Sequence, residues 1–284
     1  IQAYNKAILL KPDYADAYNN MGIALNGAYL KQPNKDIQNA ISFMLDQNSF
    51  VRPIDISKAA ISLLKFEPKL AKHLSLAYSD YTRQNLFDII NELSELPLLL
   101  KLMSVCPLPD LQLENFFKHL RLNILINISA TTMVAPELLK FLSALALQCF
   151  TNEYIYNHSA EEEKILHFLE TSVKKYLDTN KQPSPQAILT LASYKALNEY
   201  DWCNLLIVTD HIQEVFTRQV DEPNEEERLK QDLPILEKIT DSISSEVRAQ
   251  YEESPYPRWV NLGLYLQPMS IAEVVDEIKL KLQD

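Results

Sequence analysis

One apolar stretch near the middle of the chain decides the fold, and it reads Pro136-Glu137-Leu138-Leu139-Lys140-Phe141-Leu142-Ser143-Ala144-Leu145-Ala146-Leu147-Gln148-Cys149-Phe150. Proline suits the first position of a helix, because the N–H that it lacks has no partner there in any case. Apolar side chains then surround the predicted helix on nearly every side. We therefore expect a central, fully buried helix around which the rest of the protein packs.

Glycine is scarce in the 284 residues and occurs only at Gly22, Gly27 and Gly263. Three glycines at this spacing form no dinucleotide loop, P-loop or nucleophile elbow. They are also too few for the tight turns of a β-rich fold. Hydrophobic residues make up 47% of the chain, which is typical of a globular protein. The composition therefore predicts an all-α protein without a nucleotide cradle of its own.

Charge and hydropathy exclude two classes of partner. The formal net charge is -11, whereas nucleic-acid binding needs clustered Lys and Arg. No apolar run reaches the roughly 18 residues of a membrane helix. The three cysteines, Cys106, Cys149 and Cys203, lie far apart among apolar neighbours, which favours reduced, buried thiols in a cytoplasmic protein.

The first thirty residues resemble the junction between two tetratricopeptide repeats. A helical pattern leads to Pro12, which cannot continue it, and a second helix then begins. Its Tyr18, Met21, Gly22 and Leu25 fall at the spacing of one helix face, where a glycine lets a neighbouring helix approach closely. We expect residues 1–30 to be the C-terminal end of a repeat array whose other repeats lie upstream in a longer protein.

Asn20 is the candidate partner-binding residue of this segment. It lies about 200° around the helix from Tyr18, so it faces away from the packed side. In similar repeats of O-GlcNAc transferases an asparagine at this place lines the concave groove. Asn20 is therefore either a contact to a protein or peptide in the repeat groove or an ordinary exposed asparagine.

A succession of helices is predicted from residue 36 to about residue 220, separated by prolines and short polar clusters. Ser159 and Glu162 have the spacing of a capping box, and Ser184-Pro185 reads as a capping serine with proline at the first helical position. Residues 221–232 are mostly acidic, which indicates a solvated helix or connector.

A search for catalytic patterns finds no metal motif and no nucleophile with a base. Glu163 and His167 are one helical turn apart, as two metal ligands would be. Glu163, however, also belongs to the acidic first turn that a helix dipole favours. No third ligand is evident, so we predict no metal site and no catalytic residue in this chain.

One segment near the end has an unusual composition. A helix is predicted to end near Glu253, and Pro255 and Pro257 then hold the chain extended. The extended segment presents Tyr256, Arg258 and Trp259, which suit a planar or anionic ligand or another domain. The alternative is a linker whose aromatic rings only cover the edge of a core.

The same segment carries a family resemblance. Residues 251–259, Tyr-Glu-Glu-Ser-Pro-Tyr-Pro-Arg-Trp, closely resemble the Tyr-Glu-Glu-Asn-Pro-Tyr-Pro-Arg-Trp signature of bacterial proteins that join tetratricopeptide repeats to a class I S-adenosylmethionine-dependent methyltransferase domain. Residues 144–156 and 246–250 are similar to the same proteins. Ser254 departs from the more frequent asparagine but keeps a small polar side chain.

The resemblance implies that three parts of the chain have different roles. Residues 1–30 would end the repeat array, 31–240 would form an all-helical middle domain, and 241–284 would be a linker with a last helix leading to a methyltransferase domain. S-adenosylmethionine would bind the longer parent protein, and no cofactor is expected in this chain. The helical part would bind a substrate or partner protein, and Tyr256, Arg258 and Trp259 would contact cofactor, substrate or the catalytic domain.

Two other functions compete with this interpretation. The first is a non-enzymatic scaffold that recruits proteins through its repeats and helical domain. The second is a repeat-bearing glycosyltransferase, suggested by Asn20, although nothing after residue 30 resembles a sugar-nucleotide site.

Overall fold

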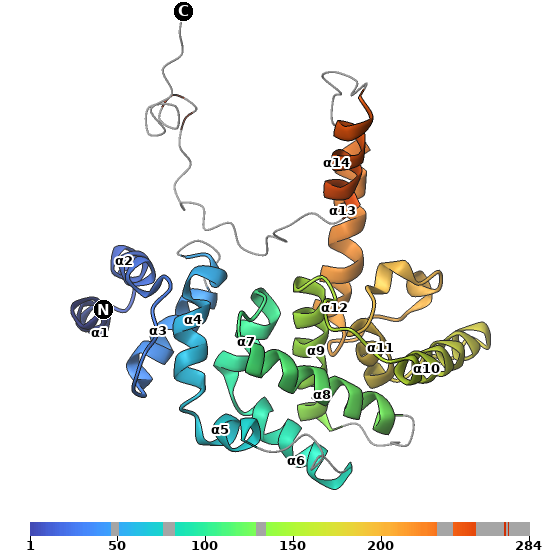
Figure 1. The fold of residues 1–284 in the computed structure, drawn as a ribbon, viewed down its shortest axis with the longest axis horizontal. Coiled ribbons are helices and arrows are strands. Elements are labelled where there is room, and N and C mark those ends of the chain that lie inside the picture. Colours follow the sequence, from blue (N-terminus) through green and yellow to red (C-terminus); the bar gives the residue numbers. More distant parts are fainter. Residues whose placement is uncertain are drawn as a thin grey trace, which may run out of the picture.

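The computed structural model describes residues 1–46, 51–75, 83–128, 135–231 and 241–253, together with Ser270 and Ala272. Every regular element in these ranges is helical, which confirms the predicted all-α class (Figure 1). The elements are α1 (Gln2–Leu10), α2 (Ala15–Leu25), α3 (Lys35–Asp46), α4 (Pro53–Leu64), α5 (Pro68–Leu74), α6 (Arg83–Ser94), α7 (Pro97–Val105), α8 (Leu111–Ile128), α9 (Pro136–Thr151), α10 (Ala160–Asp178), α11 (Pro185–Ala192), α12 (Gln213–Phe216), α13 (Glu222–Gln231) and α14 (Ser242–Glu253), with two 3₁₀ turns, η2 (Leu197–Glu199) and η3 (Cys203–Leu205), and a π-helical turn, η4 (Thr217–Asp221).

Helix α9 is the centre of the structure, as its sequence predicts. Pro136 is its first residue, and every side chain from Ala144 to Thr151 is buried. Its neighbours are α6, α7, α11 and α12. Each fully buried leucine or phenylalanine contributes on the order of 2 kcal/mol relative to exposure. The helix therefore has little freedom to move without disturbing all four neighbours.

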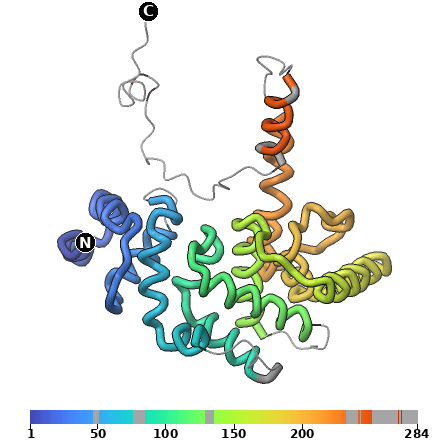
Figure 2. The backbone as a smooth tube through the Cα atoms, in the orientation of Figure 1, coloured from blue at the N-terminus to red at the C-terminus, as the bar shows by residue number. Residues whose placement is uncertain are grey.

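The body is elongated, with α1 at one end and α10 at the other (Figure 2). One connected hydrophobic core runs from Ile8 to Val220, and α7 joins its two halves because it packs against α3, α4 and α9. The predicted division at residues 30 and 31 stays a prediction, and the core is continuous across it. None of the helices in the described ranges is long and apolar enough to span a bilayer.

The predicted helix pair at the N-terminus is confirmed in detail. Helix α1 ends at Leu10, two residues before Pro12, and α2 buries Tyr18, Met21, Gly22 and Leu25. The Tyr18 hydroxyl donates to the carbonyl of Pro12 at 3.1 Å, which ties the turn to the second helix. The close neighbour of Gly22 is Val51, just ahead of α4.

The two predicted caps differ in outcome. Ser159 and Glu162 form the complete capping box at the start of α10, with both reciprocal hydrogen bonds present. Pro185 is the first residue of α11, as predicted, but the Ser184 side chain makes no capping hydrogen bond. The proline alone marks this helix start, because its fixed φ is already helical.

The acidic segment forms helix α13, which has no buried residue, as predicted for a solvated helix. The π turn η4 precedes it and buries Gln219 completely. The Gln219 amide donates to the carbonyls of Ala146 and Ala192 and accepts from the N–H of Leu197. A π turn adds one residue to the helical repeat, and here it coincides with the glutamine that attaches α12 and α13 to the body.

Gly22 provides a direct test of this packing. A Cβ at this position would overlap with Cγ2 of Val51. We expect Gly22→Ala to lower the free energy of unfolding by about 1–3 kcal/mol, the usual cost of overpacking. Urea denaturation measures this, with Asn20→Ala on the exposed side of α2 as the control, which should change it by less than about 0.5 kcal/mol.

Val51→Ala removes the methyl groups that cause the clash. Gly22→Ala should therefore cost clearly less in the Val51→Ala background than in the wild type. An equal cost in both backgrounds would show that Val51 does not set the size limit at Gly22.

Candidate functional site

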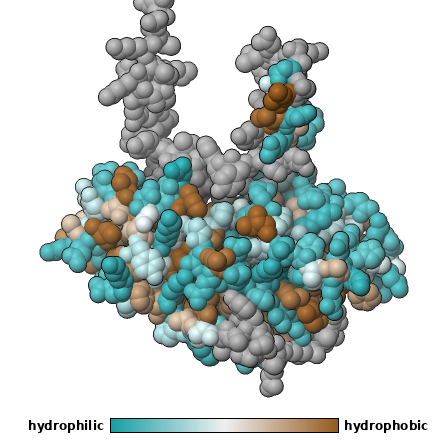
Figure 3. All heavy atoms as spheres, viewed as in Figure 1, coloured by the Kyte–Doolittle hydropathy of each residue, from teal (hydrophilic) through white to brown (hydrophobic). Residues whose placement is uncertain are grey.

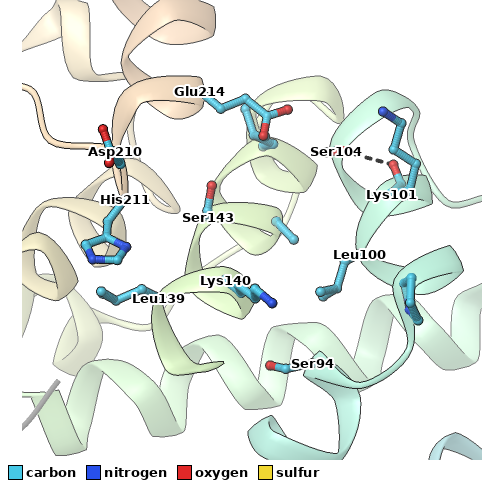
Figure 4. A pocket seen from close by; sticks show the side chains of 13 residues that line it. Ser94, Leu100, Lys101, Ser104, Leu139, Lys140, Ser143, Asp210, His211 and Glu214 are labelled. Carbon is cyan, nitrogen blue, oxygen red and sulfur yellow. Dashed lines mark hydrogen bonds between the residues drawn. The ribbon is translucent and has the colours of Figure 1, made fainter. Parts of the chain in front are cut away.

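A groove of about 440 Å³ lies between α7, α9 and the start of α12 (Figure 4). Leu100, Leu139 and Leu147 give it an apolar lining. Lys140 from α9 and Leu100 from α7 point toward each other in Figure 4. Asp210 lies ahead of α12 on one side of the groove, and Lys101 lies on α7 on the other. The site therefore combines an apolar lining with a charged rim, which is the usual composition of a binding pocket.

Buried side chains hold the walls of this groove together. The amide of Gln148, oriented to satisfy its neighbours, donates to the carbonyls of Met103 and Cys106 and accepts from the N–H of Leu108. It thereby fixes the end of α7 to α9. Arg218 of η4 donates to the carbonyl of Ser104 at 3.3 Å and so fixes the wall formed by α12 to α7. The packing of α7, α9 and η4 therefore preforms these walls of the groove.

The charges on the rim differ in their pairing. Lys101 forms an ion pair with Asp46 of α3 at 3.1 Å. Lys140, Asp210 and Glu214 are exposed and, within the described residues, form no ion pair. Unpaired exposed charges of both signs around an apolar floor favour binding of a ligand that carries its own charges.

A second groove, of about 550 Å³, lies between α3 and the starts of α5 and α7. Its charged groups are already paired. Lys35 donates to Gln38 at 3.0 Å, and Gln38 donates to Glu67 at 2.8 Å. Lys69 pairs with Glu95. Pro97, at the start of α7, lines both grooves.

A buried cluster around Arg121 joins segments of the chain that do not line the groove. Arg121 of α8 is 1% exposed and donates to the carbonyls of Tyr156 and Ser193 at 2.8 and 3.2 Å. Its guanidinium lies 4.0 Å from the ring centre of Tyr194, whose hydroxyl donates to Glu162 at 3.0 Å. Burial raises the pKa of the Tyr194 phenol, so it stays a donor. This cluster joins the segments around α8, α10 and α11.

Arg121 is therefore a structural residue that the sequence did not single out. We expect Arg121→Met to lower the free energy of unfolding by about 2 kcal/mol or more, because two buried carbonyls lose their donor. Thermal denaturation measures the loss, and the exposed Arg52→Met is the matched control. A variant as stable as the wild type would mean that the guanidinium adds nothing to the fold.

The cysteines behave as the sequence predicts, since all three are buried and free. Burial raises the pKa of the Cys106 thiol to about 12 and that of Cys149 to about 11. A nucleophilic cysteine needs a lowered pKa, so these two thiols suit packing rather than catalysis.

The raised thiol pKa values predict a loss of stability at alkaline pH. Unfolded thiols ionise near pH 8.5 while the folded ones keep their protons, so the unfolded state gains. Each thiol should remove about 2 kcal/mol of stability between pH 8.5 and pH 10. Urea denaturation at both pH values tests this against the double variant Cys106→Ala, Cys149→Ala. An equal pH dependence in both proteins would contradict the raised pKa values.

The sequence-predicted site residues have different outcomes. Asn20 is exposed on α2, and it lines neither groove. Tyr256, Arg258 and Trp259 lie outside the described residues, and their roles stay predictions. Glu163 and His167 are both exposed on α10, and within the described residues no three potential metal ligands gather.

Sequence reasoning missed the grooves. Asp210 and His211 precede α12, which begins at Gln213, and both side chains line the first groove. Lys140 is the one charged residue between Leu138 and Phe150. A single charge in an otherwise apolar helix was the sequence signal that could have indicated a groove-lining position on α9. Comparisons with protein-family models, with curated proteins and with solved structures found no match.

Proposed function

We propose that this chain is the binding and positioning region of an S-adenosylmethionine-dependent methyltransferase, with methyl transfer carried by a further domain of the same protein. The observation that carries the binding role is the preformed groove between α7, α9 and α12, with its unpaired charges. The link to methyl transfer rests on the resemblance of residues 251–259 to the methyltransferase signature.

The course of the chain supports a connection between the groove and the signature at residues 251–259. The groove wall formed by α12 continues through η4 into α13 without a break in helical structure. Helix α14 follows after residues 232–240 and ends at Glu253, inside the signature. A ligand in the groove would therefore contact the helix that leads toward the signature. In this proposal the groove holds the methyl acceptor or the protein that carries it.

A non-enzymatic scaffold is the second candidate. Its support is that the groove offers charged and apolar contacts, which suit a protein segment whether or not a methyl group is transferred. In this case α1 and α2 would be the last pair of a tetratricopeptide array, and Asn20 would contact a peptide in the repeat groove. Residues 251–259 would then be structural.

Cofactor binding separates the two functions. We expect the protein as it is made in its natural host, with any residues that flank this chain, to bind S-adenosylmethionine at one site in calorimetry. The chain of 284 residues alone should bind none. If neither protein binds S-adenosylmethionine, the methyltransferase function is contradicted and the scaffold function remains. Tight binding by the 284 residues alone would overturn our placement of the cofactor in a further domain.

Substitution of Arg258 tests whether the signature contributes to cofactor binding or turnover. In the natural protein, Arg258→Ala should weaken cofactor binding or turnover by about tenfold, the value of one charge-assisted contact. Circular dichroism should show an unchanged helical content, and Arg52→Ala is the control for a surface arginine. Unchanged binding and turnover would assign the signature to a structural role.

A further inference from the structure

The two grooves are neighbours on either side of the first turn of α7. Pro97 lines both of them, and it is the first residue of that helix. The α3–α7 groove lies on one side and the α7–α9–α12 groove on the other. A ligand that passes over Pro97 therefore reaches both grooves. An isolated small molecule in one groove would leave the other unused.

The α3–α7 groove is suited to an uncharged side chain. Lys35, Glu67, Lys69 and Glu95 are joined in pairs or through Gln38, so none of them needs a partner from a ligand. Leu64, Leu96, Leu98 and the two prolines Pro68 and Pro97 supply apolar surface. Inserting a charge here would compete with existing ion pairs, whereas an apolar side chain would bury surface without breaking any of them.

The α7–α9–α12 groove is suited to a basic side chain. Lys101 is neutralised by Asp46. Among the lining residues that have no ion pair in the described structure, two are carboxylates, Asp210 and Glu214, and one is an ammonium, Lys140. The acidic sign continues along the chain, because residues 210–227 contain seven Asp or Glu and one Arg. With a net charge of -11, the protein as a whole also attracts cations.

The width of α7 sets the distance between the two anchors. A helix with its side chains is about 10 Å across. An extended chain rises about 3.3 Å per residue, so about three residues cross the helix. An apolar anchor and a basic anchor about three to four residues apart would then fill both grooves.

We propose that the two grooves beside the start of α7 together bind one extended protein segment, with an apolar residue in the α3–α7 groove and a Lys or Arg about three to four residues away beside Asp210 and Glu214. The inference rests on the proposed binding function and specifies its ligand. It holds equally for a methyl-acceptor protein and for a scaffold partner. Lys140 is placed to pair with a carboxylate or a backbone carbonyl of the same segment.

Selection from a library of random peptides of about twelve residues, displayed on phage, tests the chemistry without assuming a partner. The bait is the 284-residue chain. We expect enriched peptides to share Lys or Arg at about three to four residues from a large apolar residue. Absence of any enriched peptide would overturn the inference, and so would enrichment of acidic peptides or of peptides without this pair.

Two sets of variants then locate the bound peptide, whose affinity is measured by fluorescence anisotropy. Asp210→Lys with Glu214→Lys should weaken binding by about tenfold or more, through like-charge repulsion. The control, Asp13→Lys with Asp16→Lys, makes the same change of net charge at the start of α2, outside both grooves, and should weaken it by less than about threefold. Equal losses would mean that the peptide follows net charge alone and would overturn the inference.

Asn39→Trp places a large side chain in the α3–α7 groove from the exposed side of α3 and should weaken binding by about tenfold. Thr171→Trp on the exposed side of α10 is the matched control and should have no effect. Unchanged affinity in Asn39→Trp would remove the apolar anchor from the proposal. These outcomes are independent of calorimetry with S-adenosylmethionine, so peptide binding without cofactor binding would reject the methyltransferase but keep this inference.

Discussion

The burial of α9 on nearly every side is the constraint on which the other elements depend. Its side chains from Ala144 to Thr151 are all buried, so α6, α7, α11 and α12 must each adapt to a surface that cannot shift. A close-packed interior transmits such a constraint, because few voids allow independent movement. The groove between α7 and α12 is open at the surface, but α9 and two buried glutamines, Gln148 and Gln219, determine its shape.

Buried polar side chains add specific hydrogen bonds to the apolar packing of the helices. Arg121, Gln148 and Gln219 each bind backbone atoms from other segments. A buried carbonyl or N–H without a partner is costly, so each of these side chains specifies one arrangement of the segments it joins. The outer surface is different. Hydrophilic residues dominate the face in Figure 3, and hydrophobic residues form small separate groups on it.

The sequence predicts those parts of the fold that depend on one helix at a time. The apolar ring of α9, the buried face of α2 and the capping box of α10 follow from periodicity and local chemistry. The grooves do not follow, because Lys140 and Glu214 are brought together only by the packing of α12 on α9. Periodicity says which face of a helix is buried, but not which exposed residues of different helices meet.

The signature and the groove are two independent parts of the functional account. The side chains of residues 251–259 lie outside the described structure, and the resemblance rests on their sequence alone. The groove depends on how α7, α9 and α12 pack, and it has no sequence motif. Helices α12 and α13 and the turn η4 connect the groove to the acidic segment.

Amide hydrogen exchange, followed by mass spectrometry on the intact protein, tests most directly whether α9 is the rigid element that preforms the groove. The account predicts that α9 exchanges most slowly, together with α7 and α11 and only through global unfolding, while the solvated α13 exchanges much faster. Exchange of α9 as fast as that of α13, or well ahead of α7 and α11, would contradict it.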